Sequence, residues 1–105
     1  MWKQWSLHLE MDFDKKELMK ALATFSIEKV LLGMGKPVLE KVTKKLEKEY
    51  KCYIPDCYDH PEYLEVVLKS VFGNSHKSIV QNIRAELVEN LDDSGIRKLV
   101  QTIGG

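Results

Sequence analysis

The sequence predicts an all-α domain, a compact bundle of about five helices, and three observations support this prediction. Apolar residues recur at helical spacing through most of the chain, residues that favour helix starts and ends divide the pattern into segments, and each segment is apolar on one side only. Such short one-sided helices need each other, because none is stable alone in water. With 105 residues, 44% of them hydrophobic and 30% charged, the chain suits one domain with one core.

The first predicted helix begins at Asp14 and ends at the glycines Gly33 and Gly35. Asp14 and Glu17 have the spacing of a capping box, and glycine is the residue that most often follows a helix end. Helical spacing assigns one apolar stripe to this helix, which we expect to face the core: Leu18, Leu22, Phe25, Val30 and Leu32.

The second and third predicted helices both have proline in the first turn, where the missing N–H group costs nothing. One runs from Lys36 to Tyr50 through Pro37, and the other follows Asp59, which we expect to cap it, through Pro61 to Phe72. Their apolar stripes are Val38, Leu39, Val42, Leu46 and Tyr50, then Leu64, Val67, Leu68, Val71 and Phe72. Residues 52–59 have no clear period and are predicted to form a loop.

Two more helices complete the predicted bundle. Ser75 is the expected cap of a helix over 75–91, with Ile79, Val80, Ile83, Leu87 and Leu91 on its apolar side. A short last helix holds Ile96, Leu99, Val100 and Ile103, and the glycines at 104 and 105 end it. Its cap is one of Asp92, Asp93 or Ser94.

Residues 1–13 form an N-terminal extension to the predicted helical domain of residues 14–105. From Trp5 to Phe13 apolar and polar residues alternate, which indicates a half-buried strand, but the stretch also fits helical spacing, so both readings stay open. A strand here needs a partner strand, and pairing across a two-fold axis would produce a homodimer. Aromatic residues are enriched at interface cores, so we take as interaction candidates Trp2, Trp5, Leu7 and Leu9.

One segment has the residue types of a metal or thiol site. Cys52, Cys57 and His60 have the spacing C-x4-C-x2-H, and thiolate and imidazole are ligands that zinc prefers. The spacing is not that of a familiar zinc knuckle, and Pro55 restricts how the thiols can converge. The favoured interpretation is two reduced cysteines that pack the interhelical loop, with a metal site and a redox pair as alternatives. We therefore expect no cofactor.

Residues 64–87 fit a helix-turn-helix with Gly73 in the turn, which suggests a DNA-binding regulator as an alternative function. The residues that would face DNA are Ser75, Lys77, Gln81 and Arg84. Lys69, where a small residue is usual, and a net charge of zero both argue against nucleic acid as a partner. No catalytic motif is visible, so we expect a protein that is not an enzyme.

The chain contains no apolar run near the ~20 residues that span a bilayer. Its N-terminus lacks a cationic start, an apolar core and a small-residue cleavage site, which together mark secretory signals. The sequence therefore predicts a cytoplasmic protein with no membrane partner.

A set of loop and core residues also supports a family resemblance. These residues are Cys52, Asp56-Cys57-Tyr58, Pro61-Glu62-Tyr63-Leu64, Val67-Leu68, Phe72-Gly73, Ile79 and Ile83. Over about residues 18–91 the chain resembles a family of small archaeal helical domains, found alone and as output modules joined to signalling proteins. The resemblance implies a regulatory context and no catalytic residue. We expect a non-enzymatic interaction or regulatory module that associates with itself.

Overall fold

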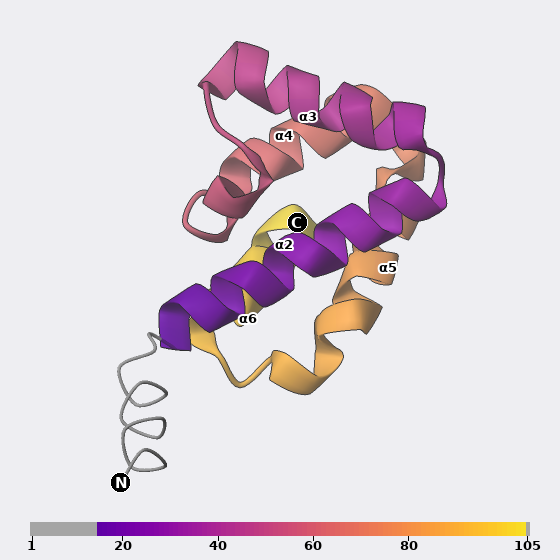
Figure 1. Cartoon of the computed structure of the whole chain (residues 1–105). Helices are drawn as coiled ribbons and strands as arrows, with labels where there is room; N and C mark the ends of the chain where they lie inside the picture. Colours follow the sequence, from indigo (N-terminus) through magenta and orange to yellow (C-terminus); the bar gives the residue numbers. More distant parts are fainter. Residues whose placement is uncertain (1–14, 105) are drawn as a thin grey trace, which may run out of the picture.

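The computed structural model describes residues 15–104, and this part of the chain is all-α, which confirms the predicted fold class (Figure 1). The α-helices are α2 (Lys15–Gly33), α3 (Lys36–Tyr50), α4 (Pro61–Phe72), α5 (His76–Leu87) and α6 (Ser94–Gly104). Three short 3₁₀ helices join them: η1 (Ile54–Tyr58), η2 (Gly73–Ser75) and η3 (Val88–Asn90). Residues 15–104 contain no strand, and the strand predicted in residues 1–13 lies outside the described residues.

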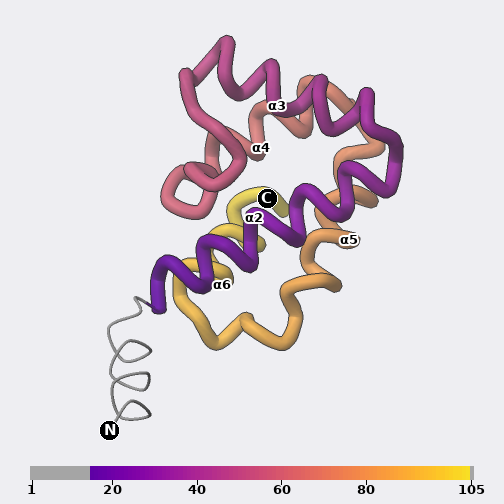
Figure 2. The backbone as a smooth tube through the Cα atoms, in the orientation of Figure 1, coloured from indigo at the N-terminus to yellow at the C-terminus, as the bar shows by residue number. Residues whose placement is uncertain are grey.

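The helices pack around α6, the last and shortest of them. α2 and α3 form a hairpin, α4 packs against α3, and α5 packs against α2 (Figure 1). α6 returns to the middle of the molecule, where it contacts α2, α4, α5 and η1 (Figure 2). All four apolar residues predicted for this helix are buried, so a segment of 11 residues contributes a large share of the core.

The predicted helix boundaries hold where backbone geometry decides them. α2 ends at Gly33, and Gly35 has a φ of 130°, a conformation that L side chains rarely adopt. Pro37 lies in the first turn of α3 and Pro61 in the first turn of α4, as predicted. α3 ends at Tyr50, and the next residue, Lys51, caps it with a left-handed φ of 53°, the only positive φ of a non-glycine residue within 15–104.

The caps agree with the sequence only in part. Asp93 caps α6, because its Oδ2 accepts a hydrogen bond from the Ile96 N–H at 3.0 Å. The caps predicted at Asp59 and Ser75 are wrong. The residue directly before α4 is His60 and not Asp59. The side chain of His60 forms no hydrogen bond to the first turn of α4, and that of Ser75 forms none to the first turn of α5. Ser75 has helical backbone geometry because η2 runs directly into α5, so no open first turn remains for it to cap.

The core contains the apolar stripes predicted for α3 to α6. The fully buried residues of these helices with the largest side chains are Val42, Leu46, Leu64, Val67, Leu68, Ile83, Leu87, Ile96, Leu99 and Ile103. The segment predicted as a loop adds to the same core. Residues 54–58 form η1, and it buries Ile54, Cys57 and Tyr58. The Tyr53 N–H donates to Asp56 Oδ2 at 2.8 Å, which stabilises the start of this turn.

The apolar stripe predicted for α2 is wrong for three of its five residues, while Leu22 and Val30 pack against the core. The residues that α2 buries are Met19, Ala23, Ser26, Ile27 and Leu31. Leu18, Phe25 and Leu32, which we expected in the core, are 48%, 63% and 52% exposed, and Leu22 and Val30 are only partly buried. α2 is apolar on two opposite sides, and periodicity alone does not distinguish them. The side with small residues lies inside, where the neighbouring elements approach α2 closely.

Candidate interaction surface

The outer side of α2 presents a row of exposed apolar side chains. Leu18, Phe25 and Leu32 are each seven residues apart, and seven residues return an α-helix to the same side with a drift of about 20°. Ala21 lies between the first two and is also exposed. We call Leu18, Ala21, Phe25 and Leu32 the outer stripe of α2. Isolated exposed apolar residues are common, but several exposed apolar residues along one side of a helix indicate an interaction site.

Phe25 stands between two shallow hollows on this surface. One hollow of about 380 Å³ is lined by Ala21, Thr24 and Phe25 of α2 together with Pro55 of η1. The other, of about 410 Å³, is lined by Phe25, Leu32 and neighbouring residues of α2. The exposed ring can insert into a partner's surface, and the two hollows beside it can accept the partner's side chains.

Charged residues border the outer stripe. On one side Lys29 forms an ion pair with Glu86 of α5, with Nζ and Oε1 3.1 Å apart. On the other side Lys20 lies near Asp59, and the exposed Glu28 lines both hollows. An apolar centre with a polar rim is the usual composition of a protein–protein interface.

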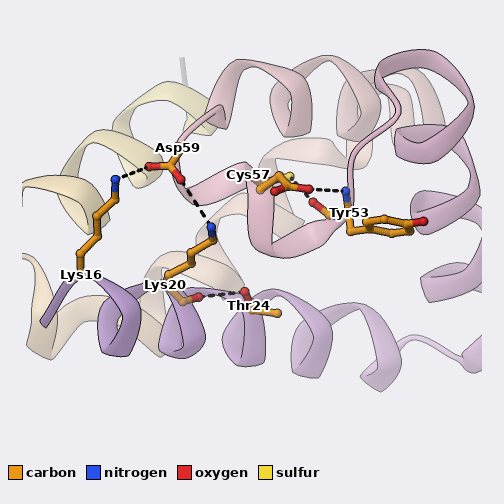
Figure 3. Close-up of polar contacts among 7 residues, drawn as sticks. Lys16, Lys20, Thr24, Tyr53, Cys57 and Asp59 are labelled. Atoms are coloured by element: carbon orange, nitrogen blue, oxygen red, sulfur yellow. Dashed lines mark hydrogen bonds and ion pairs between the residues drawn. The ribbon is translucent and has the colours of Figure 1, made fainter. Parts of the chain in front are cut away.

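The hollow beside Pro55 forms where η1 packs against α2. Figure 3 shows two lysines of α2 that reach Asp59, the residue after η1. The Asp59 carboxylate lies 3.1 Å from Lys16 Nζ and 3.5 Å from Lys20 Nζ. The hydrogen bond from Lys16, followed by the charges of both lysines, outweighs desolvation and lowers the pKa of Asp59. Further along α2, Thr24 Oγ1 donates to the Lys20 carbonyl at 2.8 Å. The helix continues unbroken to Gly33, so one helix holds the whole outer stripe.

A second polar cluster fixes α6 to η1. Tyr58 is 8% exposed, and its hydroxyl donates to Asp93 Oδ2 at 2.8 Å. Desolvation raises the pKa of Asp93, but hydrogen bonds from the Ile96 N–H, the Tyr58 hydroxyl and the Gly95 N–H outweigh it and hold the pKa below the ordinary value of 3.8. The carboxylate thus joins the start of α6 to the buried tyrosine of η1.

The charge on Asp93 predicts a specific acid sensitivity. Since the folded-state pKa is lowered, its stabilisation is present above the unfolded pKa and is lost as the pH falls through the folded pKa, below 3.8. Asp93→Asn retains the capping oxygen but has no charge to titrate. We expect the variant to lose less unfolding free energy than wild type between about pH 5 and pH 2, measured by urea denaturation. Asp92→Asn, at the exposed neighbour, is the control and should follow wild type. Equal acid profiles for Asp93→Asn and wild type would contradict the assignment.

The two cysteines that were predicted to pack the interhelical loop, with a zinc or redox site as alternatives, are buried and protonated. Cys52 and Cys57 are free thiols, 7% and 0% exposed. Desolvation raises the pKa of Cys52, and desolvation with the nearby Cys52 and acidic residues raises the pKa of Cys57 to about 12. Reactive cysteines need the opposite shift. The Cys57 thiol donates instead to the Tyr53 carbonyl at 3.9 Å.

His60, the third residue of that motif, is directed elsewhere. Its side chain is half exposed, stacks on Tyr63 with ring centroids 4.9 Å apart, and has Nδ1 3.4 Å from Glu62 Oε2. Tyr63 in turn stacks on Tyr50 at 4.2 Å, which joins the start of α4 to the end of α3. Within residues 15–104 no three His, Cys, Asp or Glu side chains are placed to hold a metal ion. Cys52, Cys57 and His60 are therefore not assembled as a ligand set.

Three of the four residues predicted to face DNA share one groove. Lys77, Gln81 and Arg84 are exposed on α5 and line a hollow with residues of α6. Ser75 lies outside this set, in η2. Local sequence patterns predicted neither the burial of His76 in this groove nor the exposure of Phe25. The signal for Phe25 was present: Met19, Ala23, Ile27 and Leu31 also recur at helical spacing and compete for the core.

The remaining interaction candidates, Trp2, Trp5, Leu7 and Leu9, lie outside the described residues. Comparison with known proteins found no matching family model, no similar curated protein and no similar solved structure. The resemblance to archaeal helical domains and the cytoplasmic location therefore stay predictions from sequence. Among the helices of residues 15–104, none has the length and apolar character to cross a bilayer. The fold and the surface together define an all-α domain with an apolar helix side turned outward.

Proposed function

We propose that this protein is a non-enzymatic interaction module that associates with itself through the outer stripe of α2. The observation that carries the proposal is Phe25, an aromatic side chain left 63% exposed in the middle of an apolar row. Large aromatic side chains supply much of the binding energy at interface centres. A regulatory role as a signalling output module is consistent with such a surface and rests on the family resemblance.

The spacing of the stripe favours a second copy of this chain as the partner. Leu18, Phe25 and Leu32 have the same order and spacing when read from either end of α2. A two-fold axis opposite Phe25 therefore sets the two phenylalanines against each other and places each Leu18 across from Leu32 of the second copy. A two-fold interface requires a self-complementary surface of this kind.

The size of the stripe indicates that it does not act alone. Burying a large apolar side chain completely contributes about 1.5–3 kcal/mol, so covering one that is half exposed contributes roughly 1 kcal/mol. Six such side chains in a symmetric pair contribute about 6 kcal/mol, which is comparable to the low end of the cost of association. A stable dimer therefore needs further apolar contacts, and Trp2 and Trp5 are the residues that we propose supply them.

Phe25→Glu in the full chain tests the proposal. We expect wild type to dimerise reversibly in sedimentation velocity over a concentration series, and Phe25→Glu to be monomeric, because the change buries a charge at the centre of the contact. Val66→Glu, at a 46% exposed residue of α4, is the matched control and should dimerise as wild type does. Both substituted residues are exposed, so both variants should keep the circular dichroism of the folded chain.

The paired variant Trp2→Ala/Trp5→Ala separates the two contributions. We expect its dimer dissociation constant to rise while the outer stripe still supports weak association. A monomeric wild type at every concentration would overturn the proposal, as would a Phe25→Glu variant that dimerises with wild-type affinity.

A further inference from the structure

The groove between α5 and α6 has the chemistry of an anion site, and we propose that it binds the phosphate group of a phosphorylated ligand. Its volume is about 380 Å³. One wall comes from α5 with Lys77, Gln81 and Arg84, the other from α6 with Val100, and His76 lies at the start of α5. This inference is independent of the outer stripe of α2.

The wall formed by α5 presents three hydrogen-bond donors in one direction. Lys77, Gln81 and Arg84 are separated by four and three residues, so their side chains lie on the same side of the helix. Neither Lys77 nor Arg84 forms an ion pair with any residue of 15–104. No acidic side chain lines the groove. Two uncompensated positive charges therefore meet in a hollow of a chain whose net charge is zero.

His76 is the second observation that indicates a ligand. It is 8% exposed, and its Nε2 atom is buried without a hydrogen-bond partner among the described residues. A buried polar atom without a partner costs about 1–3 kcal/mol, so such atoms call for an explanation. His76 lines this groove and also the adjoining hollow, which Lys69 and Asn74 help to form. In the tautomer that carries its proton on Nε2, a rotation of the ring that turns this buried atom toward the groove would let it donate to an oxyanion oxygen.

The donor set fits phosphate better than a carboxylate. A guanidinium group pairs with two oxygens of a phosphate at once, and an ammonium group adds a point charge. A terminal phosphate has three acceptor oxygens, which matches Lys77, Gln81 and Arg84 as three donors. Val80 and Val100 add an apolar wall, so the hollow accepts the organic part of the ligand as well as the phosphate.

Titration of the full chain with pyrophosphate tests this site. We expect amide shifts in ¹H–¹⁵N NMR spectra within residues 76–84 and 100–104, together with a shift of the His76 ring nitrogens. For the double variant Lys77→Gln/Arg84→Gln we expect the dissociation constant for pyrophosphate to rise about tenfold or more, because two charge-assisted bonds are lost. Solvent screens both bonds, which limits the size of the effect. The matched control is Lys44→Gln, at an exposed lysine of α3, which should bind as wild type does.

Competition identifies the source of the phosphate. Phenyl phosphate that displaces pyrophosphate, with no displacement by a short DNA duplex, indicates a small phosphorylated ligand. Displacement of pyrophosphate by the duplex indicates that the ligand is a nucleic-acid backbone. In that case the slope of the logarithm of the DNA-binding constant against the logarithm of salt concentration should fall by about 1 for Arg84→Gln. Absence of pyrophosphate shifts in this groove, or an equal loss of binding in Lys44→Gln, would overturn the proposal.

Discussion

Replacement of Gly95 by alanine is expected to lower the free energy of unfolding by about 2–4 kcal/mol. A Cβ atom on Gly95 would overlap the hydroxyl end of the Tyr58 ring and approach its Cε1 to 2.8 Å. The Tyr58 ring cannot move away without cost, because it is buried and its hydroxyl is hydrogen-bonded to Asp93, the cap of α6. Moving the ring therefore costs apolar burial and a hydrogen bond together.

The opposing effect is smaller. Alanine favours a helix over glycine by about 1 kcal/mol, and Gly95 lies in the first turn of α6. Gly33→Ala is the matched control, because a Cβ there meets no atom within 4 Å. Chemical denaturation should show Gly33→Ala at or slightly above wild-type stability and Gly95→Ala well below it.

A double-mutant cycle assigns the loss to the ring. Tyr58→Leu removes the atoms that the new Cβ would meet, so Gly95→Ala should cost far less in that background than in wild type. An equal cost in both backgrounds would show that Gly95 is required for another reason.

Leu64→Ala is expected to destabilise the fold by about 2–5 kcal/mol, the range for large-to-small changes at fully buried leucines. Leu64 is 0% exposed on α4, and α4 packs against α3, α6 and η1. The loss of stability has two parts: the favourable free energy of burying the removed methyl groups is lost, and the cavity that they leave adds a further cost. For a domain of this size we expect the midpoint of thermal unfolding to fall by roughly 10 °C or more.

Val66→Ala provides the comparison on the same helix. Val66 is 46% exposed, so its truncation leaves no cavity and should change the unfolding free energy by about 0.5 kcal/mol or less. If the two variants melted together, the orientation of α4 described above would be incorrect.

The sequence predicted most of the helices because their signals are local. The proline in the first turn of α3 or α4 acts through its own ring, and Gly35 acts through a φ that other residues avoid. The stripes of α3 to α6 were correct because each of these helices has a single apolar side, which leaves one way to bury it. Asp93 was among the predicted caps because a carboxylate three residues before an N–H group reaches it within one turn.

Local signals did not decide the caps at Asp59 and Ser75. Asp59 has the right residue type for a cap, but Lys16 and Lys20 of α2, far away in sequence, attract its carboxylate. Ser75 does not cap α5, because η2 continues the helical backbone directly into α5. The outcome at Asp59 therefore depends on a helix distant in sequence, whereas the outcome at Ser75 depends on the backbone of the residues directly before it.

The sequence by itself determined that residues 15–104 are helical, where most of their helices begin and end, and which side of α3 to α6 is buried. Only the tertiary structure decided which of the two apolar sides of α2 joins the core, because each side satisfies the helical period. Packing against α3, α5 and η1 selected the side with Ala23 and Ser26 and left Phe25 outside. The groove beside His76 likewise requires α5 and α6 together, since neither helix forms a hollow alone. Both proposed sites therefore depend on how the helices pack, and not on the period of any one helix.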